Sequence, residues 1–247
     1  MPAARMPAAG VRWRVSRRWP GWVADRAGAL DEACAVAGDL PLAGAGRTLE
    51  RWSALAALAA DDLVLARLAE AHADAVAIVA ELTGEPLPPG SRWGVWAAED
   101  PAAALTAAPL DGQGADWLLD GSKAWCSGAT LLTHALVTAR HGRSRRLLAV
   151  ALDAPGVSVA GDDWADPGMK GADTRRVTFG QVRAHAVGGP DDYLRRPGFW
   201  IGGIGVAACW YGGATAVAAP LRERVAGQGG DPHAAAHLGA VDVALGG

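Results

Sequence analysis

Hydrophobic positions in the first third of the chain repeat at the spacing of α-helices. Over residues 25–82, leucine and valine recur three and four residues apart, with charged residues between them. Pro and Gly interrupt this pattern at residues 40–48, and Thr48 is placed to begin the next helix. Residues 83–91 contain three prolines and two glycines, which predicts the end of the helical region.

After residue 91 the pattern changes to short runs that are rich in β-branched and aromatic residues, as is typical of strands. These runs are RWGVWAAE, WLLDGSKAW, HALVTAR, RLLAVAL, VSVAG and RRVTFGQV, separated by turn chemistry such as DGQG and HGRSR. The Asp120–Gly121 pair predicts a hairpin turn, because glycine accepts the positive φ that a primed turn requires. We therefore expect a β domain over about residues 92–187.

Two helices are predicted after the β domain. Residues 198–225 are long enough for a helix, and their glycines predict tight packing, because small residues let another backbone approach. After the loop AGQGGD, Pro232 is placed to begin a second helix.

Composition narrows the possible functions. The 247 residues are 51% hydrophobic and include 11 Trp but only 2 Phe and 2 Tyr, so tryptophan supplies most of the aromatic surface. A net charge of −3 argues against a nucleic-acid partner. Residues 199–219 come closest to a membrane span but contain five glycines, and no signal peptide is recognisable. We expect a cytoplasmic protein with no membrane span.

The three cysteines, Cys34, Cys126 and Cys209, are far apart in sequence. They form neither a CxxC pair nor a disulfide framework, which predicts buried thiols in a reducing compartment.

Several motif-like segments have ordinary structural interpretations. Residues 203–208 fit the GxGxxA dinucleotide fingerprint, but no strand is predicted before them, so we interpret them as a helix-packing segment. His233 and His237 have the spacing of zinc ligands without a third ligand nearby, and we expect surface histidines and no metal. Glu70 and Asp74 share a helix face, which we interpret as solvated. The signatures of hydrolysis and phosphoryl transfer are absent from the sequence.

Three segments together resemble the acyl-CoA dehydrogenase family. They are SKAWCSGA at residues 122–129, GMKGADT at 168–174 and GVAACWYGGA at 205–214. The resemblance covers about residues 40–245 and implies an α+β fold. The residue patterns and the resemblance together divide the chain into a basic amino-terminal segment (1–24), a helical domain (25–90), a β-barrel middle domain (91–190) and an incomplete carboxy-terminal helical region (191–247), the start of a helical bundle.

In that family, a tryptophan and a hydroxyl residue at the end of a middle-domain strand contact the flavin of FAD. The resemblance assigns these contacts to Trp125 and Ser127, with Cys126 between them in the cofactor-binding segment. Independently of the resemblance, Trp offers a flat apolar face and Ser a small donor and acceptor, which suit a planar redox cofactor. The alternative is structural: a buried Trp125 that covers the barrel core, with Ser127 in the following turn.

The sequence also departs from the family pattern. The family's Thr-Glu-Pro and Gly-Ser-Asp segment corresponds to VWAAEDPAAALTA, in which Glu99 and Pro101 match but the Gly-Ser-Asp is missing. Residues 198–211, where some members carry the catalytic glutamate, contain no carboxylate, so no catalytic residue is assigned. The sequence ends before the usual position of that base and before the family's contacts from a neighbouring subunit to FAD. We expect either a fragment of a longer protein or a short subunit that associates with a partner.

The resemblance implies an FAD-dependent oxidoreductase of fatty acid metabolism that removes the α proton and the β hydride of an acyl-CoA thioester. It also implies an electron-transfer partner and a homo- or hetero-oligomer. Two alternatives remain open. One is a non-catalytic partner subunit, which the missing base and the missing Gly-Ser-Asp favour, and the other is a reduced-flavin monooxygenase on the same fold.

Overall fold

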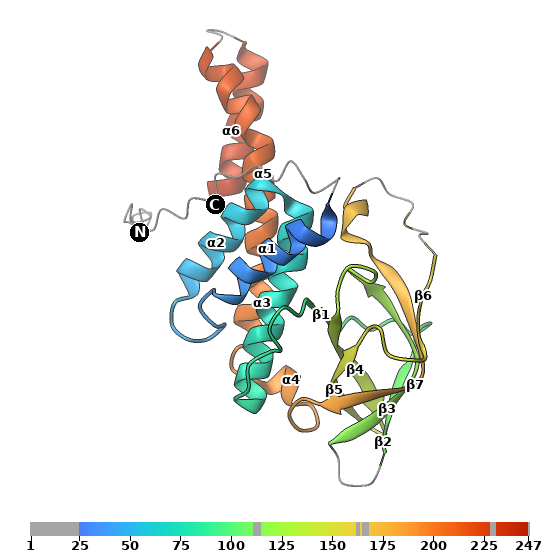
Figure 1. Ribbon diagram of the computed structural model, residues 1–247. Coiled ribbons are helices and arrows are strands. Elements are labelled where there is room, and N and C mark those ends of the chain that lie inside the picture. Colours follow the sequence, from blue (N-terminus) through green and yellow to red (C-terminus); the bar gives the residue numbers. More distant parts are fainter. Residues whose placement is uncertain (1–24, 111–114, 162–163, 165–167, 228–230, 247) are drawn as a thin grey trace.

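The computed structural model describes residues 25–110, 115–161, 164, 168–227 and 231–246. They form a group of amino-terminal helices, a β-barrel beside it, and a long carboxy-terminal pair of helices (Figure 1). The predicted α+β fold, with a helical amino-terminal part and a β-barrel in the middle, is confirmed. The basic segment expected at residues 1–24 and the DGQG turn at residues 111–114 lie outside the described residues.

The amino-terminal helices begin and end at the signals that the sequence carries. They are α1 (Arg26–Gly38), α2 (Thr48–Asp61) and α3 (Leu63–Thr83). The carboxylate of Asp62 accepts the Leu65 N–H at 2.9 Å, which caps the start of α3. Gly84, with φ 75°, ends α3 in the left-handed conformation that glycine adopts without strain. The predicted helix start at Thr48 and the predicted break after residue 83 are confirmed.

Five strands close the barrel, and two more pair with its wall. The strands are β1 (Trp93–Trp96), β2 (Leu105–Pro109), β3 (Asp116–Cys126), β4 (His134–His141), β5 (Ser144–Ala151), β6 (Val157–Val159) and β7 (Arg175–Ala186). The order β4-β2-β3-β7-β5 closes through pairing of β5 with β4, while β1 pairs with β4 and β6 with β7. The sequence missed β2, because LTAAP is rich in alanine, which has low strand propensity.

Asp120 and Gly121 do not form a turn, so the hairpin prediction is wrong. β3 continues through both residues, and its pairing with β7 shifts register between Leu119 and Gly121, as in a β-bulge. Gly121 has φ 118°, and a Cβ atom there would collide with the carbonyl oxygen of Ala104, just before β2. The glycine is needed for a positive φ and a close backbone approach inside one long strand.

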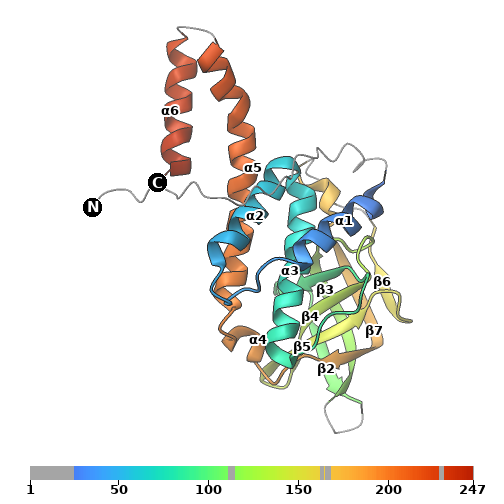
Figure 2. The ribbon, with the colours of Figure 1, turned by 60° about the vertical axis from the view of Figure 1, so that its left-hand side comes forward.

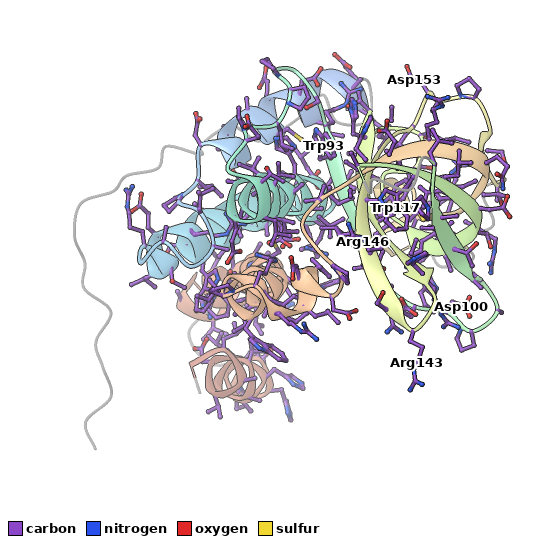
Figure 3. The ribbon with its side chains drawn as sticks, turned by 90° about the horizontal axis from the view of Figure 1, so that it is seen from below. Trp93, Asp100, Trp117, Arg143, Arg146 and Asp153 are labelled. Atoms are coloured by element: carbon purple, nitrogen blue, oxygen red, sulfur yellow. The ribbon has the colours of Figure 1, made fainter. Side chains whose placement is uncertain are left out.

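The helical part contacts the barrel through α3 and β1. Trp93, labelled in Figure 3, lies at this junction. Its main-chain N–H donates to Nδ1 of His72 on α3 at 3.3 Å, and its ring stacks on His134 with the ring centres 4.7 Å apart. These contacts place the barrel edge against α3, which positions the cavity described below.

The carboxy-terminal elements are α4 (Asp192–Arg195), α5 (Phe199–Gly227) and α6 (Pro232–Gly246). α5 packs along α2 and α3, while its last turns and α6 extend away from the rest as an antiparallel pair (Figures 1 and 2). A Cβ atom at Gly212 would collide with the main-chain carbonyl of Ala56 on α2, which confirms the predicted tight glycine packing. The predicted helix start at Pro232 is also confirmed. By length and composition alone, α5 could cross a membrane.

The remaining motif-like segments lie on the two carboxy-terminal helices. Residues 203–208 lie inside α5, where Gly205 faces Leu55 and Glu70, so the interpretation as a helix-packing segment is confirmed. His233 and His237 are exposed on α6, and the described residues contain no group of three potential metal ligands.

Glu70 and Asp74 lie in the interior, so the prediction of a solvated face is wrong. They are 4% and 8% exposed, and α5 covers them. Glu70 pairs with Arg67, and Asp74 lies 3.4 Å from Nη2 of Arg196. Burial raises the pKa of both carboxyls, and the arginine beside each one opposes that rise. Helical spacing showed that the two acids share a face but not that a helix distant in sequence covers it.

Candidate active site

A cavity of about 500 Å³ lies where α3, α5 and the barrel meet. Its described lining is mainly aromatic and apolar, with one charged side chain. The residues that define it are Arg67 on α3, Trp96 on β1, Trp125 at the end of β3, Trp164 and Met169 between β6 and β7, and Trp210 on α5. A cavity of this size and character suits a small organic ligand or cofactor.

Trp125 has an unusual backbone conformation for a bulky residue. Its φ is 55°, in the left-handed region, which costs a non-glycine residue about 1–2 kcal/mol. Trp125 is 55% exposed and lines the cavity, whereas Trp93, Trp96 and Trp117 are buried in the core. The structural alternative for Trp125, a buried ring that covers the core, is therefore wrong. Strained residues that persist in a fold concentrate at functional sites.

Ser127 presents a hydroxyl beside the ring of Trp125. Its Oγ lies 2.8 Å from Oγ1 of Thr174, and both residues line the cavity. The indole Nε1 of Trp96 donates to the carbonyl of Ser127 at 3.0 Å, which holds the turn after β3 in place. The wall thus combines a flat aromatic face with two adjacent hydroxyl groups, each able to donate and accept hydrogen bonds.

The segments SKAWCSGA and GMKGADT, distant in sequence, lie against each other. The Gly128 N–H donates to the carbonyl of Ala172 at 2.7 Å, and the Ala129 N–H donates to that of Asp173 at 3.1 Å. The main-chain N–H and the hydroxyl of Thr130 both donate to Oδ2 of Asp173, at 2.7 and 2.6 Å. Each segment therefore supports the other, and together they form one wall of the cavity.

Cys126 faces away from the cavity. Its side chain is fully buried in the core, and its Sγ donates to the carbonyl of Lys123 at 3.3 Å. Burial raises the pKa of its thiol to about 12, so the reactive thiolate does not form near neutral pH. A ligand in the cavity could contact Cys126 only through its main chain. The prediction of three buried thiols is confirmed.

Arg67 and Trp210 were missed by the sequence interpretation. Arg67 is the only charged residue among the described lining residues. Glu70, which does not line the cavity, forms an ion pair with Nη1 of Arg67. Burial opposes the charged form of Arg67 and the neighbouring carboxylate favours it, and on balance the pKa of Arg67 is raised. The arginine therefore stays charged beside an aromatic cavity. An arginine inside an otherwise apolar stretch of helix was the signal that could have identified it.

Carboxylates and imidazoles are absent from the described lining of this cavity. Glu99, which matched the family pattern in sequence, instead accepts hydrogen bonds from Nε and Nη2 of Arg145 at 2.9 and 3.0 Å. With Pro101 it lines a different cavity, between β3, β4 and the loop after β1.

Sequence comparison identifies the middle of the chain. Residues 96–182 match the family model described as "Acyl-CoA dehydrogenase, middle domain". This span runs from the last residue of β1 into β7 and contains the whole Trp125–Thr174 wall. This chain has the acyl-CoA dehydrogenase fold. A search of curated protein sequences gave no match.

Solved structures with the acyl-CoA dehydrogenase fold resemble most of the chain. KijD3 in complex with FMN and dTDP-3-amino-2,3,6-trideoxy-4-keto-3-methyl-D-glucose matches with a TM-score of 0.66 and 21% identity, over 88% of this chain and 59% of KijD3. TdsC from Paenibacillus sp. A11-2, in complex with FMN and indole, matches with a TM-score of 0.63 and 21% identity, over 90% of this chain and 73% of TdsC. An FAD-dependent dehydrogenase matches with a TM-score of 0.64 and 17% identity, over 91% of this chain and 75% of the dehydrogenase. The chain thus spans 59% of the length of KijD3, and at these identities the matches show the fold alone.

Proposed function

We propose that the cavity between α3, α5 and the barrel binds a flavin, and that the chain is part of a flavin-dependent oxidoreductase. The observation that carries this proposal is the exposed ring of Trp125, held in a left-handed backbone conformation beside the hydroxyls of Ser127 and Thr174. A planar ring system with polar edges fits a flat apolar face that is flanked by two small donors and acceptors.

The chain's residues have distinct roles in this proposal. The indole of Trp125 packs against the flavin ring, and Ser127 with Thr174 bonds its polar edge. Trp96 holds the turn that carries Ser127 through its hydrogen bond to that carbonyl. FAD, which the sequence predicts, and FMN, which is bound in KijD3 and TdsC, share the ring that these residues would hold.

Of the candidate reactions, the described lining favours oxygen-dependent monooxygenation. When bound, reduced flavin would supply the two electrons with which one atom of O₂ enters the substrate and the other leaves as water. Removal of an α proton from a thioester requires a base within hydrogen-bond reach, and the described lining offers Arg67 instead. Arg67 suits a substrate with an electron-rich or anionic oxygen, and the tryptophans suit its flat apolar part.

Acyl-CoA dehydrogenation is the second candidate, and the match of residues 96–182 to the acyl-CoA dehydrogenase middle domain favours it. That reaction would need a base from residues outside the described lining, on this chain or on a partner subunit. The two reactions also need different redox partners, because monooxygenation needs a reductase that supplies electrons and dehydrogenation needs an acceptor that removes them.

Flavin retention tests the binding proposal. The purified chain is incubated with FAD or FMN, desalted, and its visible absorption recorded. We expect a retained flavin band that Trp125→Ala and Ser127→Ala each weaken. Trp200→Ala removes an indole that is exposed on α5 outside this cavity and should leave the band unchanged. A folded wild-type chain that retains neither flavin contradicts the proposal and leaves the non-catalytic partner subunit as its replacement.

Turnover assays then separate the reactions. O₂ consumption that depends on a flavin reductase and on an aromatic substrate supports monooxygenation. Reduction of a dye acceptor by an acyl-CoA, without a reductase, supports dehydrogenation. Arg67→Met should raise the KM for the substrate of either reaction more than it changes flavin retention, because the proposal places this residue against substrate.

A further inference from the structure

A second cavity, of about 300 Å³, lies between β3, β4 and the loop that connects β1 to β2. The residues that matter here are Glu99, Asp100, Thr106, Lys123, Thr138 and Arg140. None of them lines the Trp125 cavity. In Figure 3, Asp100 lies at the lower right of the barrel, and Arg143 lies at the bottom of the barrel on the turn between β4 and β5.

Lys123 places a buried amine in this cavity. Its side chain is 3% exposed, and its Nζ donates to the carbonyl and the hydroxyl of Thr138, at 2.9 and 2.8 Å. An ammonium group has three donors, and these two acceptors are neutral. Among the described residues no carboxylate forms an ion pair with it. A buried ammonium is costly unless a negative charge accompanies it.

The two carboxylates at the cavity are already paired with arginines. Glu99 accepts both hydrogen bonds of Arg145, and this contact holds the pKa of Glu99 below its ordinary value. Asp100 lies 3.6 Å from Nη2 of Arg176, and its Oδ1 accepts the Ala102 N–H at 2.9 Å. Each acid thus forms a neutral unit with its arginine, although Glu99 still favours the charged form of the nearby amine.

Arg140 adds a second positive charge. It lies on β4 at the exposed edge of the cavity, opposite Thr106 of β2. The described residues include no hydrogen-bond or ion-pair partner for its guanidinium group. Lys123 and Arg140 also help to lower the pKa of Glu99, but together with Arg145 and Arg176 these four cations outnumber the carboxylates of Glu99 and Asp100.

We propose that this cavity binds a phosphate group, with Lys123 as the buried donor and Arg140 as the donor at the edge. A phosphate dianion balances the two unpaired charges, and its several oxygens can accept from the third donor of Lys123 and from the fork of Arg140. A free phosphate ion and the phosphate group of a small organic molecule share this chemistry. The site is independent of the proposed flavin cavity.

Lysine NMR offers a direct test, because the chain contains only two lysines, Lys123 and Lys170. Protein labelled with ¹³C at the lysine ε carbon therefore shows two side-chain signals, and the exposed Lys170 serves as internal reference. Without ligand, burial should hold the pKa of Lys123 below its ordinary value. Inorganic phosphate should move the Lys123 signal saturably and raise its pKa, and Lys170 should not move. Parallel shifts of both signals, or no shift at Lys123, would overturn the proposal.

Matched variants and ligands sharpen the test. Arg140→Gln should weaken phosphate binding by about tenfold, which is about 1.4 kcal/mol, while Arg143→Gln removes the same charge from the exposed β4–β5 turn and should leave Kd unchanged. Equal losses in the two variants, or acetate binding as tightly as phosphate, would refute a phosphate site. Tighter binding of glycerol 3-phosphate than of inorganic phosphate assigns the site to the phosphate of an organic ligand. The opposite order assigns it to the free ion.

Discussion

Replacing Trp125 by glycine and, separately, by alanine distinguishes backbone strain at the end of β3 from loss of the indole. Both substitutions remove the same ring, so their stabilities differ through the backbone. At φ 55°, alanine pays about 1–2 kcal/mol that glycine avoids. Glycine loses about 0.5–1 kcal/mol more conformational entropy on folding. We therefore expect Trp125→Gly to be more stable than Trp125→Ala by about 1 kcal/mol.

Urea unfolding of the flavin-free variants measures this difference, and thermal unfolding should show about 2–4 °C between them. Thr178, exposed in the middle of β7 with no positive φ, is the control position. There the order should reverse, with Thr178→Ala more stable than Thr178→Gly by about 0.5–1 kcal/mol. If Trp125→Ala equals or exceeds Trp125→Gly in stability, the argument that this site stores backbone strain is refuted.

Three further predictions concern stability. Arg196→Met should cost about 3–5 kcal/mol in urea unfolding, because it leaves the buried Asp74 carboxylate without its arginine and also removes the partner of Glu81. The exposed Arg195→Met should change little, and a loss below about 1 kcal/mol for Arg196→Met would refute this prediction. Gly212→Ala should lower the free energy of unfolding by about 1–3 kcal/mol, because the added methyl collides with the α2 backbone. Gly203→Ala lies in open space on the same helix and should raise the free energy of unfolding by up to about 1 kcal/mol. Thermal unfolding that shifts in the same direction for both variants would contradict the packing argument. Burial lowers the pKa of His72, so the unfolded chain binds a proton at this residue more readily than the folded chain, and the free energy of unfolding should fall as the pH drops below 6.5. Urea unfolding at several pH values should show that the free energy of unfolding depends less steeply on pH in His72→Gln. An unchanged pH dependence would contradict this prediction.

Local features could be predicted from the sequence because they depend on residues close together in the chain. The start of α3 after Asp62, the end of α3 before Gly84 and the start of α6 at Pro232 follow from capping, glycine and proline chemistry within one turn. Strands with clear β-branched or aromatic runs were also predicted, and β2 was missed because its alanines carry little strand signal. The order of the motifs was enough to predict the fold.

Contacts between distant segments needed the tertiary structure. The Asp120–Gly121 pair fits both a turn and a bulge, and the approach of the chain before β2 decides for the bulge. Helical spacing placed Glu70 and Asp74 on one face, and α5 decides that this face is buried. The sequence by itself determined most of the helices and strands, and its motifs indicated which segment carries the predicted flavin contacts. Only the tertiary structure decided what each side chain faces, because burial and charge pairing depend on elements that are far apart in the chain.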